Sequence, residues 1–442
     1  MPSSWNIVPL ESLLRDPKAI AVGVMYRGPH SPGGTPLVKV GDIRNGIVST
    51  RPTYCISAET NQEHARTQLK GDEFLITLVG APGECVVVTP RMAGWNPARA
   101  IAVLRLKNPS LRTYLKAVLE SASGKHLIDS VLNTTVQKTL NLKDIRSLPV
   151  PMPPASTIAG ISEVSQALTG RISLLRETNA TLEAIAQALF KSWFVDFDPV
   201  HAKQQGIAPA GMDEATAALF PETVEEWCAN VSRPTVGDLT AEGLLVIGDG
   251  YRAKNDELGQ PGLPFVRAGD LNQGQITPTK DYLAQASFTL AVSKMARPGD
   301  TAFTSKGTIG RFAYVDFASG DAVYSPQVCF WRSLDRDSIE PAYLHFWMKS
   351  AGFMGQVNAV RGQAAIMEYV SLSDQRRMRL DLPPIVVQRR FAELVNVLLS
   401  RISCNRATAM HLTSIRDELL PRLISGQLRL PQAEAELTEA LA

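Results

Sequence analysis

Two long stretches of the chain carry apolar residues at helical spacing. Within residues 156–194 the stripe consists of Ile161, Leu168, Ile172, Leu175, Leu182 and Leu189, and within residues 384–423 of Phe391, Val395, Leu398, Ile402, Leu412 and Leu419. Steps of three, four and seven are typical of helices that pair. A helix of about 40 residues extends ~60 Å. We therefore expect two long helices that form an antiparallel coiled-coil spacer. The alternative is that each helix packs on its own globular domain.

The residues before each long helix show a different pattern. Short apolar runs such as residues 74–79 and 85–88 lie between Gly and Pro, which indicates strands joined by turns. Residues 111–120 and 342–350 have helical spacing. The fold class predicted for these globular parts is α+β.

The chain repeats itself at a nearly constant offset. Residues 40–46 (VGDIRNG) recur as residues 268–274 (AGDLNQG), Gly71-Asp72 recurs as Gly299-Asp300, and Pro153-Pro154 recurs as Pro383-Pro384, at offsets of 227–230. This indicates a duplicated unit of one domain followed by one helix. The predicted organisation is a first domain over 1–154, a central helix over 155–195, a partly structured linker over 196–238, a second domain over 239–383, a distal helix over 384–425 and a tail over 426–442.

Composition excludes several classes of protein. The 442 residues are 45% hydrophobic and 20% charged, as in ordinary globular proteins, and the formal charge is +2. No run of 18 apolar residues occurs, so we expect no membrane partner. Five scattered cysteines without a C-x-x-C pair favour a reducing cytoplasm over a disulfide framework, and predict no metal site.

Catalytic motifs are missing from the sequence. It has no P-loop, no H-E-x-x-H, no G-x-S-x-G and no glycine-rich dinucleotide turn. The N-P-P-[FY] pattern of adenine-N6 methyltransferases is also absent. We therefore expect that the chain itself is not an enzyme and holds no cofactor.

The chain resembles the DNA-specificity subunit of type I restriction–modification systems. The resemblance is carried by the duplicated layout, by residues 189–200 (LFKSWFVDFDPV) and by the two domain exits at residues 148–154 and 380–384. It implies that each globular part is a target-recognition domain that reads one half of a bipartite, asymmetric site in double-stranded DNA. It further implies that the helices set the gap and bind two methyltransferase subunits, which carry S-adenosylmethionine, and that motor–nuclease subunits join them.

Base edges are read by Arg or Lys at guanine and by Asn or Gln at adenine, while aromatic side chains can stack on a base. The candidates for DNA binding in the first domain are Arg44, Asn45, Arg91, Trp95, Asn96, Lys125 and Lys138. Those in the second domain are Asn272, Gln273, Lys306, Arg311, Tyr324, Gln327, Arg361 and Gln363. Each of them has an alternative interpretation as an ordinary surface residue.

Trp193 and Phe194 end the central helix. Aromatic residues are common at interface hot spots, so this pair is a candidate for partner docking, although such a pair is more often core. Two other functions stay open from sequence. One is a stand-alone enzyme with a site built between the halves, and the other is a coiled-coil adaptor that binds proteins but not DNA.

Overall fold

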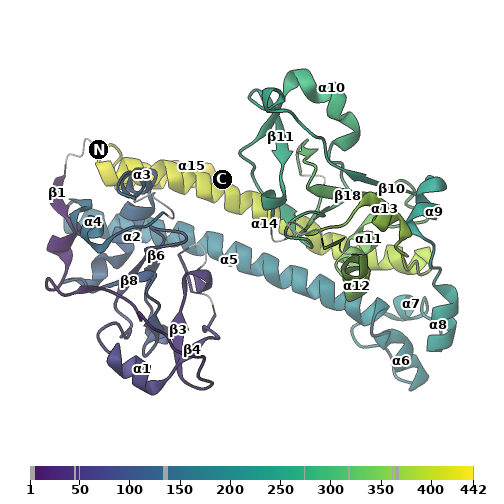
Figure 1. The fold of residues 1–442 in the computed structure, drawn as a ribbon, viewed down its shortest axis with the longest axis horizontal. Coiled ribbons are helices and arrows are strands. Elements are labelled where there is room, and N and C mark those ends of the chain that lie inside the picture. Colours follow the sequence, from purple (N-terminus) through teal and green to yellow (C-terminus); the bar gives the residue numbers. More distant parts are fainter. Residues whose placement is uncertain are drawn as a thin grey trace. The chain divides into compact units, whose positions relative to one another are not determined.

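The computed structural model describes residues 5–43, 46–48, 50–132, 138–272, 274–316, 319–360, 362–363 and 368–441. Its contacts divide the chain into two compact units. The first holds Met1–Leu174 with Thr408–Ala442, and the second holds Leu175–Ala407. The two longest helices that the structure describes are α5 (Ala155–Phe194) and α14 (Ile385–Ser425) (Figure 1). The boundary between the units divides each of them, so one part of each helix belongs to the first unit and the other part to the second.

The first domain is built on two small sheets. A four-stranded sheet has the order β2-β8-β5-β6, and a three-stranded sheet has the order β4-β3-β7, in which β3 and β7 are parallel. The strands are β1 (Asn6–Pro9), β2 (Ile20–Val22), β3 (Thr35–Val38), β4 (Cys55–Ile56), β5 (Phe74–Thr77), β6 (Cys85–Val87), β7 (Asn96–Pro97), β8 (Ile101–Leu104) and β9 (Pro149–Met152). The helices are α1 (Ala58–Glu63), α2 (Arg112–Glu120), α3 (Ala122–Ser130) and α4 (Leu142–Ser147), and α15 (Leu430–Leu441) belongs to the same unit.

The second domain repeats this topology. Its four-stranded sheet has the order β10-β18-β15-β16, and its three-stranded sheet has the order β14-β11-β17, with β11 and β17 parallel. The strands are β10 (Leu245–Asp249), β11 (Gly262–Val266), β12 (Leu271–Asn272), β13 (Gln275–Ile276), β14 (Tyr282–Ala284), β15 (Thr301–Thr304), β16 (Phe312–Tyr314), β17 (Val323–Tyr324), β18 (Val328–Ser333), β19 (Gly362–Gln363) and β20 (Glu368–Tyr369). The helices are α6 (Asp198–Gln204), α7 (Glu214–Ala217), α8 (Val224–Asn230), α9 (Val236–Ala241), α10 (Phe288–Ala291), α11 (Pro341–Met348), α12 (Ala351–Val360) and α13 (Leu372–Arg377).

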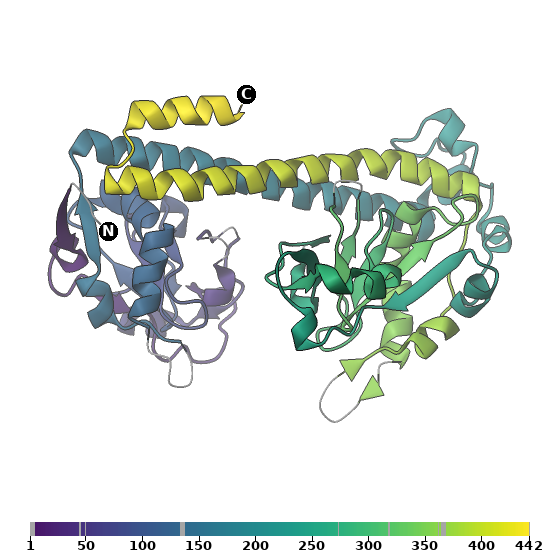
Figure 2. The ribbon, with the colours of Figure 1, turned by 90° about the horizontal axis from the view of Figure 1, so that it is seen from above.

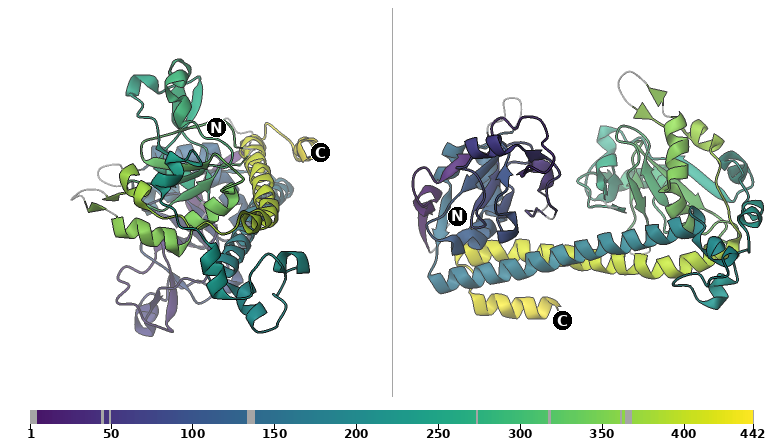
Figure 3. Two further views of the ribbon diagram at one scale, coloured as in Figure 1. Left: turned by 90° about the vertical axis from the view of Figure 1, so that its right-hand side faces the viewer. Right: turned by 90° about the horizontal axis from the view of Figure 1, so that it is seen from below.

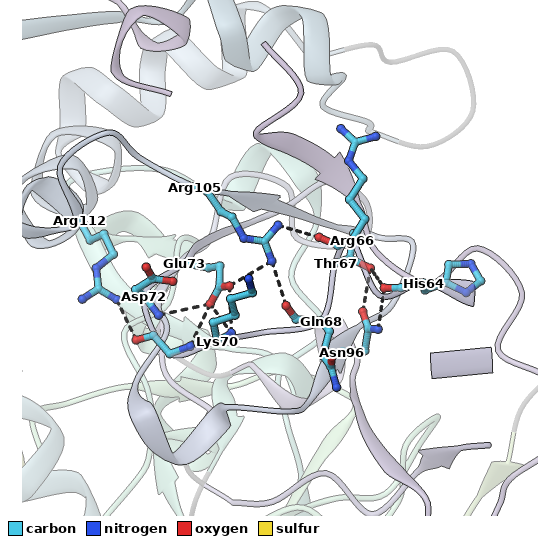
Figure 4. A network of polar contacts seen from close by, with 11 residues as sticks. His64, Arg66, Thr67, Gln68, Lys70, Asp72, Glu73, Asn96, Arg105 and Arg112 are labelled. Atoms are coloured by element: carbon cyan, nitrogen blue, oxygen red, sulfur yellow. Dashed lines mark hydrogen bonds and ion pairs between the residues drawn. The ribbon is translucent and has the colours of Figure 1, made fainter. Parts of the chain in front are cut away.

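The repeat extends to a buried ion pair in each domain. Arg105 contacts Glu73 at 3.1 Å in the first domain (Figure 4), and Arg332 binds Asp300 through two hydrogen bonds of 2.6 and 2.7 Å in the second. Both carboxylates are fully buried. The sequence match had aligned Asp72 with Asp300. The structure corrects this, because Asp72 is exposed and the adjacent Glu73 occupies the buried position.

A buried tyrosine in each domain has the same role. The hydroxyl of Tyr114 on α2 donates to the carbonyl oxygen of Pro151 at 2.6 Å, and that of Tyr343 on α11 donates to the carbonyl oxygen of Asp381 at 2.6 Å. Each bond ties the helix after the sheet to the segment that leads into the long helix. The two domains therefore share a frame as well as a strand order.

In the second unit the parts of α5 and α14 run antiparallel. Asn179 lies beside Asn405, with an amide hydrogen bond of 2.9 Å, while Phe190 lies beside Phe391, with ring centroids 5.7 Å apart. Residue numbers thus rise along one helix as they fall along the other. The end of α5 enters the core of the second domain, rather than packing on the domain that precedes it in the sequence.

In the first unit, Ile161 of α5 shares a core with Leu419 and Leu423 of α14. Helix α14 ends at Ser425, and the next residue, Gly426, adopts a φ of +80°, a left-handed conformation that is common just after a helix. The segment expected as a tail contains α15. This helix lies alongside the first part of α5 (Figures 2 and 3), where Leu430 covers Gly160.

Residues 196–238, expected as a partly structured linker, form several helices that belong to the second unit. These helices are α6 to α9, and Phe220 and Trp227 are buried in the core of the second unit. No helix in the described part of the chain is both long enough and apolar enough to span a membrane.

Candidate nucleic-acid interface

In the second domain, the predicted residues Lys306 and Gln327 lie beside the β19–β20 hairpin. The turn after β15 contains Lys306, whose backbone pairs with Tyr369 of β20. The amide of Ser305 donates to the carbonyl oxygen of Gln327 at 3.0 Å, which places Gln327 beside the same turn. Lys306 is half-buried and Gln327 is exposed. The β19–β20 hairpin projects from the side of the domain opposite to α14 (Figure 2), so this group is presented away from the long helices.

Two further predicted residues line a polar hollow of about 430 Å³. Asn272 at the end of β12 and Arg311 just before β16 are both exposed, and Lys349 closes the hollow from the end of α11. Lys349 forms an ion pair with Glu183 of α5. The Arg311 side chain is not in an ion pair with any described residue. Its guanidinium is therefore available for a phosphate or a guanine edge.

The predicted residues of the first domain are more dispersed. Arg91 is exposed and donates to the carbonyl oxygen of Val48, while Trp95 is half-buried against the core between the sheets. Lys125 is exposed on α3. Lys138 is exposed next to Thr139, whose backbone pairs with Val79. That pairing corresponds to the one between Lys306 and Tyr369, so Lys138 flanks the matching turn.

Several predicted residues lie where side chains are not described. Arg44, Asn45, Gln273 and Arg361 fall outside the described residues. Gln363 is placed through its backbone in β19 alone. Their assignment to DNA stays a prediction.

Burial removes Asn96 from the set of base-reading candidates. The residue is fully buried in β7. Its Oδ1 accepts from the Thr67 hydroxyl at 2.8 Å, and its Nδ2 donates to the carbonyl oxygen of His64 (Figure 4). The same Nδ2 also donates to Oδ1 of Asn61 at 3.0 Å. All of these groups belong to the same domain. Asn96 therefore fastens the segment after α1 to the sheet, and its amide is not free to meet a base.

Tyr324 is corrected for the same reason. It is fully buried in β17, its ring stacks on Phe330 at 5.2 Å, and its hydroxyl donates to Asp300 at 3.0 Å. Burial raises the pKa of this hydroxyl well above its usual range, with a further rise from the Asp300 carboxylate. Tyr324 therefore completes the buried Arg332–Asp300 group instead of stacking on DNA.

The aromatic pair at the end of α5 is core as well. Trp193 is 3% exposed and lies against Phe220 and Phe391, with ring centroids 5.2 and 6.0 Å away. Phe194 contacts Tyr343 at 5.0 Å. Both side chains are used inside the second unit, so the docking interpretation of this pair is wrong, and the interpretation as core holds.

One surface was not anticipated from the sequence. In the loop between β2 and β3, residues 25–30 (MYRGPH) are all exposed, and Tyr26 is 80% exposed. The available signal was an aromatic residue, an arginine and a histidine in a run with turn-forming residues and without an acid. Among the described residues, no group of three His, Cys, Asp or Glu side chains is placed to hold a metal ion.

The duplicated α+β domain thus presents lysine side chains beside the corresponding turn of each copy. The chain is similar to specificity subunits of type I restriction enzymes. It is 27% identical to the HindI specificity subunit of Haemophilus influenzae over 71% of this chain and 74% of that protein. It is 24% identical to the MjaIX specificity subunit of Methanocaldococcus jannaschii over 74% and 71%. These relatives agree with the expectation of a non-catalytic specificity subunit. No family model matches the chain.

The chain also matches solved structures at lower identity. A type I restriction–modification S subunit from M. genitalium is 14% identical, with a TM-score of 0.47, and covers 95% of this chain and 96% of that chain. An HsdS subunit from Thermoanaerobacter tengcongensis is 16% identical, with a TM-score of 0.33 over 97% and 98%.

Proposed function

We propose that the chain is the DNA-specificity subunit of a type I restriction–modification complex, in which each domain reads one half of a bipartite, asymmetric site. The observation that carries this proposal is the similarity to named specificity subunits over about three quarters of both chains. The repeated topology supports it, because two copies of one domain suit a site with two separate halves.

The turn after β15 is our choice for direct reading in the second domain. Gln327 is exposed and carries an amide that suits adenine, and Lys306 beside it carries a cation that suits guanine or phosphate. In the first domain the matching turn is flanked by Lys138, at the position that Glu368 occupies beside the turn of the second domain, so this position carries opposite charges in the two copies. Two domains that present different side chains on the same frame would read different half-sites.

We further propose that methyltransferase subunits carrying S-adenosylmethionine dock on the long helices, that motor–nuclease subunits join them, and that the complex works in the cytoplasm. Since Trp193 is buried and Phe194 is half-buried against the same core, the proposed docking surface is instead an exposed apolar stripe on α14. Val386, Leu394 and Val397 are spaced by eight and three residues, so they share one helical face, and they are 50%, 37% and 68% exposed.

The deciding experiment maps N6-methyladenine across the source genome by long-read sequencing, with the gene intact and deleted. The proposal predicts that one split motif loses methylation on deletion and regains it on complementation. A gene carrying Val397→Asp should fail to complement, while the purified variant still binds the split duplex. An intact methylome, together with purified chain that binds no duplex even at low salt, would instead favour a protein-binding adaptor.

A further inference from the structure

The exposed loop between β2 and β3 is held in place by a tyrosine behind it. The Arg27 guanidinium carbon lies 4.7 Å and the Lys39 ammonium nitrogen 5.0 Å from the centre of the Tyr54 ring. The Tyr54 hydroxyl donates to the carbonyl oxygen of Gly28 at 2.6 Å. Cations over an aromatic face are attracted to it. Arg27 and Lys39 are thus gathered at one place, and we call residues 25–30 with Lys39 and Tyr54 the Tyr26 surface.

Two further contacts fix the ends of this loop. Nδ1 of His30 accepts from the amide of Cys55 at 3.1 Å, which leaves Nε2 as the N–H donor of the exposed ring. The amide of Met25 donates to Nε2 of His64 at 3.4 Å. The loop is therefore anchored at both ends, although its side chains face solvent.

The charge of this region is one-sided. Residues 17–58 contain five Lys or Arg (Lys18, Arg27, Lys39, Arg44 and Arg51) and a single acid, Asp42. The Asp42 carboxylate accepts from the backbone amide of Lys39 at 2.8 Å. Neither Arg27 nor Lys39 forms an ion pair with a described residue. Unpaired cations around an exposed aromatic ring suit a polyanion with apolar faces, which describes DNA.

In the corresponding region of the second domain, acidic residues balance the positive charge. Residues 245–286 contain four Lys or Arg (Arg252, Lys254, Arg267 and Lys280) and five acids (Asp249, Asp256, Glu257, Asp270 and Asp281). Arg267 forms an ion pair with Asp281, and the Tyr251 hydroxyl donates to Glu257 at 3.0 Å. The excess of positive charge is therefore a property of the first copy and is not required by the shared fold.

The Tyr26 surface is linked through its sheet and along the chain to predicted DNA-binding residues of its domain. It is built on β3 and β4 of the three-stranded sheet, whose third strand, β7, directly follows Trp95. Lys39 precedes the short 3-10 helix Val40–Asp42, which leads to the predicted residues Arg44 and Asn45. Along the chain, Lys39 lies five residues before the first of these predicted residues.

We propose that the Tyr26 surface is an accessory DNA contact of the first domain. Arg27 and Lys39 bind backbone phosphates next to the first half-site, and the Tyr26 ring packs on the sugars or base edges between them. This inference rests on the proposed function. It adds an asymmetry, because the first domain grips DNA through its three-stranded sheet and the second does not.

The test measures binding of the full-length chain to a fluorescent duplex that carries the split motif, over a series of KCl concentrations. Arg27→Ala with Lys39→Met should lower the slope of log K against log salt by about two, since each phosphate contact contributes about 0.9. Tyr26→Ala should weaken binding at least about fivefold, and Tyr26→Phe should leave it unchanged because the ring is kept. The matched control is Arg252→Ala with Lys254→Ala in the second domain, which should change the slope by less than about 0.5.

The outcomes separate this inference from the proposed function. If the unmodified chain binds the split duplex no better than a scrambled one, the proposed function fails. If it binds specifically and the Tyr26 and Arg27 variants bind equally well with the same salt slope, the accessory contact alone is wrong. Loss of methyltransferase assembly with DNA binding intact would make the surface a protein interface and also overturn it. Unchanged thermal unfolding of the variants shows that any loss of binding is not a loss of fold.

Discussion

The two domains share a strand order and a set of buried polar contacts, and they differ in the side chains around these shared elements. Tyr114 and Tyr343 make the same hydrogen bond, and Arg105–Glu73 corresponds to Arg332–Asp300. Two positions on the following helix nevertheless differ in charge, since Lys116 and Glu120 of the first copy are replaced by His345 and Lys349 in the second. Buried groups that hold the backbone have been kept through the duplication, whereas groups around the turns that we propose to read DNA have changed.

A physical reason explains this division. A buried carboxylate without its partner is costly, so a change at Glu73 or Asp300 is tolerated only with a matching change at the arginine. An exposed side chain such as Gln327 or Lys138 has no such partner and can be exchanged at little cost in stability. Divergence therefore collects where DNA would be read.

The largest effect is expected from breaking a buried pair. Asp300→Ala leaves the Arg332 guanidinium without its carboxylate in the core, and Glu73→Ala does the same to Arg105. Each change should lower the free energy of unfolding of its own domain by roughly 3–5 kcal/mol. Denaturant titration with hydrogen-exchange mass spectrometry of each domain measures this. Asp72→Ala is the matched control and should have almost no effect, so an equal loss there would contradict the assignment of Glu73.

The next effect concerns recognition. Gln327→Ala removes an exposed amide beside the β19–β20 hairpin and should weaken binding of one half-site by about 1–3 kcal/mol while the other half-site is unaffected. Competition between duplexes with substitutions in either half measures this difference. Ser325 lies nearby but is buried, so Ser325→Ala serves as a control that leaves the presented surface unchanged. Equal weakening at both half-sites would show that Gln327 does not read a base.

A smaller effect compares the two tyrosines directly. Tyr114→Phe and Tyr343→Phe each delete a buried hydroxyl that donates to a carbonyl oxygen at 2.6 Å. Because both bonds tie a helix to the domain exit, each variant should lose about 1 kcal/mol in its own domain. Urea unfolding monitored domain by domain tests the equality. A loss of stability in only one copy would mean that the two hydrogen bonds, although alike in geometry, do not contribute equally to their domains.

The fold was more predictable than the site. Leu168, Leu175 and Leu182 recur every seven residues, which indicates a helix with one buried face. The structure confirms this helix as α5. Offsets between equal residues indicate the duplication. Burial, in contrast, is a property of the whole packed domain. Asn96 and Tyr324 have the chemistry of a reading residue, yet they face inward, and no local pattern reveals that. Tyr26 was missed for the converse reason, since exposure of one ring leaves no periodic signal.

The smallest effect is a difference in pH response between the copies. His345 is fully buried, and burial lowers its pKa well below the usual value, with a further contribution from Lys349. In the unfolded chain the same imidazole has a pKa of about 6.5, so below that pH the unfolded state binds more protons and the second domain loses stability. Glu120 has the opposite sign. Burial raises its pKa, partly offset by Lys116, so protonation on acidification towards its ordinary value stabilises the first domain.

Between pH 7 and pH 6 the histidine contribution amounts to less than about 1 kcal/mol, because only part of the unfolded population is protonated in that window. Urea midpoints followed by tryptophan fluorescence report on the second domain, since Trp227, Trp331 and Trp347 lie in its core. The midpoint should fall on acidification in the unmodified chain, and it should fall less in His345→Phe, which keeps a ring in the cavity. An identical fall in both proteins would assign the acid sensitivity to another group and remove this difference between the two copies.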